Sequence, residues 1–153
     1  LQVYGFYEEV PVSNTDDVQL TSLASNAPEA ILYENFEGID ADSSPLRYRA
    51  CFDTSMSGAM LTETYVIYDN PIPNVAPRWF ECFDAQDIGA ALEADEMTAY
   101  LGIFNVVYGF DRVVAIDDAG QGYVWHQINA CGQAAFDGDP LPQGCPPPPE
   151  AGQ

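Results

Sequence analysis

His126 is the only histidine of the 153-residue chain, so acid–base or metal chemistry near neutral pH would centre on its imidazole. It lies in the segment Tyr123-Val124-Trp125-His126-Gln127-Ile128, whose alternation of side chains is typical of a β-strand. A catalytic triad would need a serine nucleophile and an acid beside the histidine, and the chain has no Gly-x-Ser-x-Gly motif. The pattern favours a hydrogen-bonded structural histidine, with a small enzyme built on His126 as the alternative.

Four cysteines could supply either redox chemistry or covalent cross-links: Cys51, Cys82, Cys131 and Cys145. None of them forms Cys-x-x-Cys, the spacing typical of thioredoxin-like and zinc sites. Gly, Pro and Asp between the last two suit a closed surface loop, so we favour Cys131–Cys145 with Cys51–Cys82 among the possible connectivities. Two disulfides would indicate an oxidising compartment outside the cytosol. The alternatives are a thiol-redox pair and four buried thiols in a cytosolic protein.

Paired carboxylates raise the possibility of calcium binding. Asp40-x-Asp42-x-Ser44 begins like an EF-hand loop, but Pro45 stands where that loop needs Gly, and Cys51 where it needs a bidentate Glu. Four further aspartates are equally typical of turns, in which the carboxylate accepts hydrogen bonds from its own backbone. These are Asp117, Asp118, Asp137 and Asp139. We predict no dedicated metal site and no cofactor, only weak binding of divalent cations, with a calcium-binding module as a further candidate function.

The chain carries 24 acidic residues against four arginines and no lysine, a formal charge of −20. Such a field repels nucleic acid and anionic lipid headgroups and attracts basic proteins. The acidity has two interpretations: a surface that docks a basic partner, or adaptation to salty water. Docking through charge would weaken steeply as salt rises.

The sequence predicts an α+β domain, mainly antiparallel sheet with one principal helix, stapled by disulfides. The helix is expected over residues 88–96, capped by Asp84 or Asp87. Main strands are expected over 46–52, 62–68, 98–107, 112–116 and 122–128, with shorter ones near 18–23 and 30–33. Residues 37–45 and the segment after Cys131 have the composition of turns. An apolar content of 47 % supports a packed core.

The chain divides by composition into an opening segment, 1–10, a globular domain, 11–145, and a proline-rich tail, 146–153. Tyrosines at 4 and 7, followed by Glu8 and Glu9, fit either the end of a membrane anchor or a first strand. Trp79, Phe80 and Phe83 follow a proline-rich loop and would form either an exposed patch for a partner or part of the core.

Several segments resemble an uncharacterised family of small envelope proteins from marine and photosynthetic alphaproteobacteria of the Rhodobacter and Roseobacter type. They are Glu34–Phe52, Leu61–Tyr65, Trp79–Asp84, Asp111–Ala115 and Trp125–Asn129. The resemblance implies a periplasmic domain that a single N-terminal segment, missing here, anchors to the inner membrane. It implies no activity. The histidine-kinase label that some members carry has no support in this sequence, which lacks a glycine-rich nucleotide motif.

Taken together, these observations predict a periplasmic, membrane-tethered accessory or assembly module without catalytic activity. Its expected partner is a basic envelope protein or a membrane complex, bound through the acidic surface. The alternative is a small envelope enzyme or thiol-redox factor that uses His126 or the cysteines.

Overall fold

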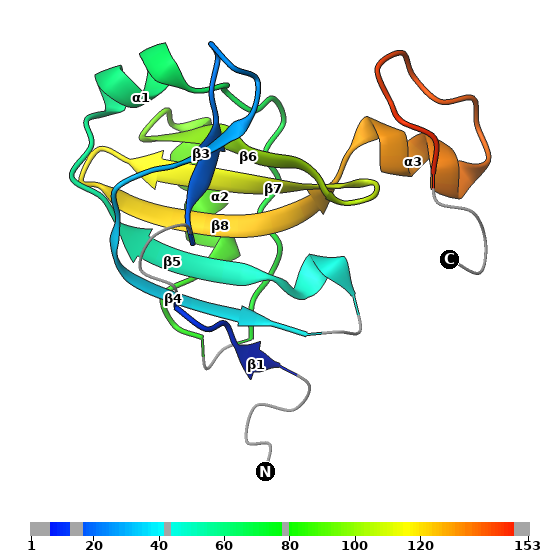
Figure 1. The fold of residues 1–153 in the computed structure, drawn as a ribbon. Coiled ribbons are helices and arrows are strands. Elements are labelled where there is room, and N and C mark those ends of the chain that lie inside the picture. The colour runs from blue at the N-terminus through cyan, green and yellow to red at the C-terminus, as the bar shows by residue number, and fades with distance from the viewer. Residues whose placement is uncertain (1–6, 13–16, 42–43, 78–79, 149–153) are drawn as a thin grey trace.

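The computed structural model describes residues 7–12, 17–41, 44–77 and 80–148 (Figure 1). A six-stranded antiparallel sheet, in the order β1-β4-β5-β8-β7-β6, forms the centre of the fold. Its strands are β1 (Glu8–Glu9), β4 (Glu34–Asp40), β5 (Arg49–Asp53), β6 (Met97–Val107), β7 (Phe110–Asp117) and β8 (Gln121–Ile128). The remaining elements are the hairpin β2 (Gln19–Thr21) and β3 (Pro28–Ala30), the 3-10 turn η1 (Pro45–Arg47), and the helices α1 (Gly58–Thr64), α2 (Ala85–Glu93) and α3 (Ala130–Asp137). The predicted α+β class is confirmed.

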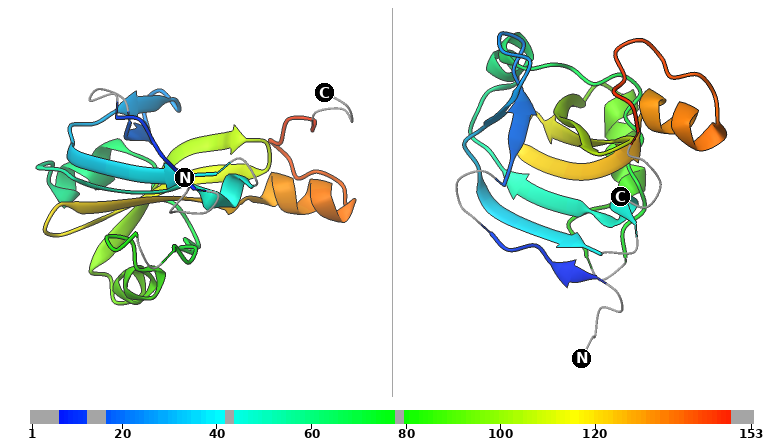
Figure 2. Two further views of the ribbon diagram at one scale, coloured as in Figure 1. Left: turned by 90° about the horizontal axis from the view of Figure 1, so that it is seen from below. Right: turned by 45° about the vertical axis from the view of Figure 1, so that its right-hand side comes forward.

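Both faces of the central sheet are covered, the hairpin β2–β3 lying over one and α2 over the other (Figure 2). Neighbouring residues of a strand therefore enter different cores. On β8, Val124 packs with Leu20 on the hairpin side, whereas Trp125 packs with Ile88 on the α2 side. Because both faces are buried, the central strands need apolar side chains on both sides rather than simple alternation with polar ones.

The predicted helix exists as α2 but begins three residues earlier than expected. Asp84 is its N-cap, and the carboxylate accepts a hydrogen bond of 3.1 Å from the backbone N–H of Asp87. The helix ends at Glu93, and Asp95 soon afterwards has a positive φ of 59°. That left-handed conformation stops the helical hydrogen-bond pattern before the expected end at Glu96.

The prediction of a strand over residues 62–68 is wrong for residues 62–64, which belong to a helix. Ser57 caps α1 by accepting a hydrogen bond from the N–H of Met60, so the chain is helical as far as Thr64. Beyond it, only single β-bridges form, from Tyr65 and Ile67. A serine cap before a run of helix-forming residues outweighed the β-branched residues that suggested a strand.

Two segments expected to be turns are regular in part. Of residues 37–45, the first four belong to β4, where a Cβ on Gly38 would come within 3.3 Å of the Ala50 side chain. After Cys131 the chain is helical as far as Asp137, the end of α3, whose cap Asn129 accepts from the N–H of Gly132 at 2.9 Å; residues 138–148 contain no helix or strand, as expected. Glycine, serine and aspartate suggested turns, whereas strand pairing and capping use the same residues inside regular structure.

Both disulfides have the predicted pairing. Cys51–Cys82 joins β5 to the turn before α2, and Cys131–Cys145 joins α3 to the C-terminal segment. They indicate an oxidising, extracytoplasmic compartment. None of the helices within the described ranges is long and apolar enough to cross a membrane.

Phe80 and Phe83 belong to the core beside Trp125, being only 7 % and 4 % exposed. This corrects the interpretation of these two rings as an exposed patch. Trp79, the third residue of that group, lies outside the described residues.

Because β5 pairs with β8, any side chain at position 122 would collide with the ring of Phe52. A Cβ there would come within 2.1 Å of the Phe52 ring on the opposite strand. We expect Gly122→Ala to displace this ring and lower the free energy of unfolding by about 2 kcal/mol, as overpacking does in other cores. Urea denaturation measures the change. Gly58→Ala is the control, because a Cβ at Gly58 meets nothing within 4 Å; equal stability losses in the two variants would contradict the packing.

Candidate functional site

Both ring nitrogens of His126 are engaged inside the protein. Nδ1 lies 2.8 Å from the carbonyl oxygen of Pro45 and Nε2 3.0 Å from Nε of Arg112. Since an arginine can only donate, Nε2 is the acceptor and Nδ1 carries the proton. The imidazole is therefore neutral, and neither nitrogen is free to contact a substrate.

Burial, reinforced by the charge of Arg112, lowers the pKa of His126 to about 3. The side chain is 4 % exposed and stacks on the Tyr48 ring with 4.7 Å between ring centroids. The guanidinium of Arg112 covers that same tyrosine ring, 4.3 Å from its centroid. This stack joins the end of η1 to β7 and β8, so His126 is buried and hydrogen-bonded between these elements.

The aspartates considered as calcium ligands make local contacts. Asp117 accepts hydrogen bonds from the N–H groups of Ala119 and Gln121 in the β7–β8 turn, and Asp137 accepts one from Gln133 within α3. In the described part of the chain, no group of three or more His, Cys, Asp or Glu side chains is placed to hold a metal ion. Asp42 lies outside that part, whereas Asp40, Asp118 and Asp139 lie in it.

A groove of about 630 Å³ lies on the α2 side of the sheet, beside the disulfide Cys131–Cys145, and is called the α3 groove below. Three segments surround it, which are residues 66–72, the ends of the central strands, and the C-terminal loop at 142–145. Its apolar walls include side chains that are strongly exposed. They are Ile67, Ile72, Phe104 and Ile128.

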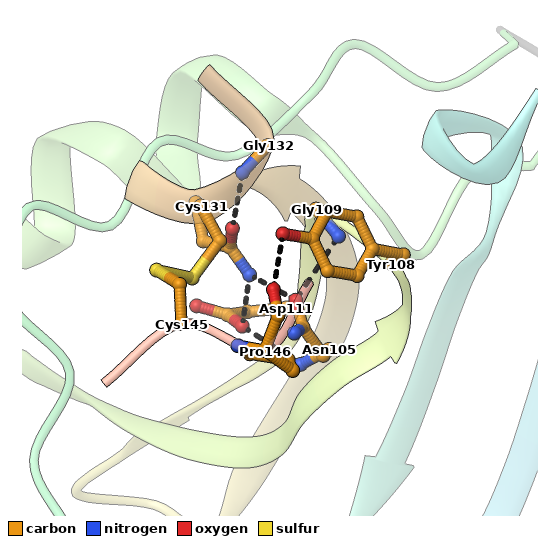
Figure 3. The surroundings of a disulfide bond; sticks show 9 residues. Asn105, Tyr108, Gly109, Asp111, Cys131, Gly132, Cys145 and Pro146 are labelled. Carbon is orange, nitrogen blue, oxygen red and sulfur yellow. Dashed lines mark hydrogen bonds between the residues drawn. A yellow bond between two sulfur atoms is a disulfide. The ribbon is translucent and has the colours of Figure 1, made fainter. Parts of the chain in front are cut away.

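A buried carboxylate forms the floor of the α3 groove. Asp111 accepts hydrogen bonds from the hydroxyl of Tyr68 at 2.8 Å, the amide of Asn129 at 2.8 Å and the backbone N–H of Asn105 at 3.1 Å. Burial, together with the hydrogen bond to Asp111 and its negative charge, raises the pKa of Tyr68, so its hydroxyl stays a donor. The Asp111 side chain and its amide neighbours point toward one another beside the disulfide (Figure 3).

The other polar groups of the floor are also bonded within the protein. Gln127 accepts from the N–H of Ile72 at 2.7 Å and from the indole of Trp125 at 3.0 Å, and donates to the carbonyl of Asn70. Among the described side chains, the amide nitrogen of Asn105 is the buried polar atom left without a partner. The floor thus combines the buried negative charge of Asp111 with polar groups that mostly bond to one another.

Helix α3 reaches the sheet through a contact between two glycines. A Cβ on Gly132 would lie 2.3 Å from the carbonyl oxygen of Gly109 in the β6–β7 turn. Around this contact, Phe136 packs on Phe110 with 5.9 Å between ring centroids, and Tyr108 donates to the carbonyl of Pro146 at 2.8 Å. The helix and its disulfide-linked loop are therefore held as a wall of the α3 groove.

With this geometry described, the comparison with known proteins places the chain in a family. Residues 18–146 match the model described as "Family of unknown function (DUF6446)", so the chain belongs to it. The matched range contains the His126 stack and the α3 groove. Neither a curated protein nor a solved structure matches the chain. The expectation of an uncharacterised family is confirmed.

Sequence patterns did not identify the α3 groove. Tyr68, Asp111 and Asn129 lie on three separate segments, and no short motif joins them. One signal was present, since Asn129 directly before Ala-Cys-Gly is a good N-cap and predicts the helix that forms a groove wall. The long-range approach of the three side chains depends on strand register, which is fixed by the fold.

The depressed pKa of His126 predicts a pH-dependent stability. Above the ordinary histidine pKa of 6.5, the imidazole is neutral in both the folded and the unfolded state; below that pH, the unfolded chain binds a proton that the folded protein excludes until about pH 3. The free energy of unfolding should therefore fall by about 1.4 kcal/mol per pH unit from this residue as pH drops below its ordinary pKa. Urea denaturation between neutrality and about pH 5 avoids most carboxylate titration.

His126→Asn provides the control for that pH effect. The variant lacks the titrating ring and should lose less stability over the same pH interval, although it is less stable at every pH. Parallel curves for the variant and the wild type would contradict a buried neutral histidine.

The glycine contact predicts that Gly132→Ala undocks α3. We expect amide hydrogen exchange in residues 130–137 to accelerate by at least about tenfold, because local opening then costs less free energy. Gln133→Ala, at an exposed neighbouring position, is the control and should leave exchange unchanged. Unchanged protection in Gly132→Ala would show that the helix does not depend on this contact.

Proposed function

We propose that this protein is a non-catalytic accessory or assembly module of the alphaproteobacterial cell envelope, tethered to the periplasmic side of the inner membrane. Its acidic surface docks a basic envelope protein or a basic subunit of a membrane complex. The tether and the taxonomic range come from the sequence resemblance described above. The docking role comes from the placement of charge.

The main support for the proposal is that the described arginine side chains are buried or half-buried, whereas most described carboxylates are exposed. Arg49 is 5 % exposed, and its guanidinium donates to backbone carbonyls that include those of Asn74 and Val75. Arg47 and Arg112 are half-buried and lie over the rings of Tyr7 and Tyr48. Most carboxylates in the described ranges are exposed. An approaching basic protein therefore meets negative charge with few interruptions.

The engagement of the reactive groups supports binding rather than catalysis. All four cysteine sulfurs are in disulfides, and both nitrogens of His126 are hydrogen-bonded. A nucleophile or general base must be able to reach its substrate. The groups that sequence reasoning offered for these roles are occupied in this arrangement.

The tether and the charge would act together. At an ionic strength of about 0.1 M, charge acts over about 10 Å, so an acidic surface speeds the capture of a basic partner at short range. A tether confines the domain to the membrane surface and raises its effective concentration near partners held there. Weak contacts then suffice for specific assembly.

Co-purification of the full-length, membrane-anchored protein from its own host tests this function. We expect a stoichiometric partner with a basic surface at about 0.05 M salt, and its loss at about 0.5 M, where charge is screened within a few ångströms. A glycerol buffer of the same osmolality is the control and should retain the partner, because it screens no charge. A partner that survives high salt would contradict docking through charge, and no partner in either buffer would contradict an accessory role.

A further inference from the structure

The α3 groove has a neighbour on the other side of the loop at 70–73. This second hollow, called the α2 groove, has a volume of about 620 Å³ and lies between that loop and α2. The two grooves share Asn70 and Ile72. Ile72 stands between them with 64 % of its surface exposed.

We infer that both grooves together bind one extended segment of a partner polypeptide, with large apolar side chains on either side of Ile72 and lysine or arginine between them. The inference rests on the proposed docking function and assigns it a place and a recognition chemistry. It identifies the occupant as an apolar and basic peptide segment rather than a small molecule.

The apolar part of this chemistry comes from exposed aliphatic and aromatic side chains. Ile67 is 52 % exposed, Phe104 46 % and Ile128 37 %, and all three line the α3 groove with Ile72. The α2 groove adds Pro71, Pro73, Leu92 and the small residues of α2. Apolar surface gathered in hollows is typical of sites that bind a partner's side chains.

The preference for a basic segment follows from the charged residues that line the two grooves, because all of them are acidic. Asp69 and Asp111 line the α3 groove, and Glu93 lines the α2 groove, whereas neither lining contains an arginine. Polar groups of the floor already bond to one another, as Gln127 and Asn129 do. The grooves therefore offer few free donors to an anion, whereas the exposed carboxylates of Asp69 and Glu93, together with the buried negative charge of Asp111, favour a cation.

The loop that separates the grooves is held in place before any partner arrives. Gln127 accepts from the N–H of Ile72, Asn74 donates to the carbonyl of His126 at 2.6 Å, and Arg49 donates to the carbonyls of Asn74 and Val75. Binding to a pre-ordered loop loses little conformational entropy. Ile72 is thus displayed as a fixed ridge.

The two hollows favour a chain over a compact ligand. Each has a volume within the range of about 300–1,000 Å³ that holds one small molecule. A compact molecule would fill one hollow and cover one side of Ile72, leaving the other hollow open. An extended peptide directs every second side chain to the same face, so two apolar side chains can enter the two hollows on either side of the ridge while the basic side chain between them stays near the rim.

Fluorescence anisotropy with short labelled peptides tests the inference on the 153-residue chain. The probe alternates Leu with Lys; one control peptide replaces Leu by Ser at equal charge, and another replaces Lys by Glu. We expect the Leu/Lys peptide to bind at least about tenfold more tightly than either control peptide. Equal binding of the Ser/Lys peptide, or no binding of the Leu/Lys peptide, would overturn the inference.

Matched double variants separate the grooves from the overall charge. Ile72→Ser with Asp69→Asn should weaken the Leu/Lys peptide by about tenfold or more. Leu32→Ser with Asp118→Asn removes the same charge and an aliphatic residue that is at least as exposed as Ile72 but lies outside both grooves, and should change binding less than about twofold. Equal weakening by both variants would overturn the grooves as the site.

The same variants distinguish failure of this inference from failure of the proposed function. In co-purification, the full-length Ile72→Ser, Asp69→Asn protein should lose the partner that the Leu32→Ser, Asp118→Asn protein retains. Retention of a salt-sensitive partner by both would overturn the grooves and leave acidic docking standing. Absence of any partner from the wild type would overturn the proposed function itself.

Discussion

A buried guanidinium organises the surface that we assign to partner binding. Arg49 projects from β5 into the α2 side of the sheet. Among the described residues, it donates to backbone carbonyls on η1, on Tyr48 and on the loop at 74–75. Burial lowers its pKa, yet arginine stays charged, so those carbonyls must remain in place around it. The proline-rich loop is therefore fixed to the sheet, and with it the ridge at Ile72.

Because both faces of the sheet are covered by apolar side chains, the polar residues Asp111 and Asn129 lie toward the ends of the strands. The β2–β3 hairpin and α2 leave little room for polar groups over the middle of the strands. At these strand ends, the start of α3 and the disulfide-linked loop line the α3 groove. Figure 3 shows Asp111 beside this disulfide. Buried polar groups need partners, and these residues bond mainly to one another. The result is a groove with a charged floor and apolar walls.

Local signals predicted much of the fold. The β6, β7 and β8 strands, the Asp84 cap and both disulfides follow from alternation, capping and loop composition. Strand β4 and helix α3 were missed because residues 37–45 and the segment after Cys131 have the composition of turns, although Gly38 serves strand packing and Asn129 caps a helix. The groove was missed for another reason: Tyr68 meets Asp111 only through the register of the whole sheet. No local pattern carries that information.

Binding of a basic, apolar segment across the ridge at Ile72 can be measured by isoleucine-methyl NMR of the 153-residue chain, titrated with the Leu/Lys peptide. We expect saturable shifts of the Ile67, Ile72 and Ile128 methyl signals, with those of the buried Ile31 and Ile116, on the hairpin side, nearly unchanged. Shifts spread evenly over all isoleucines, or an Ile72 signal that does not move, would show that charge alone attracts the peptide and that the ridge is not its binding site.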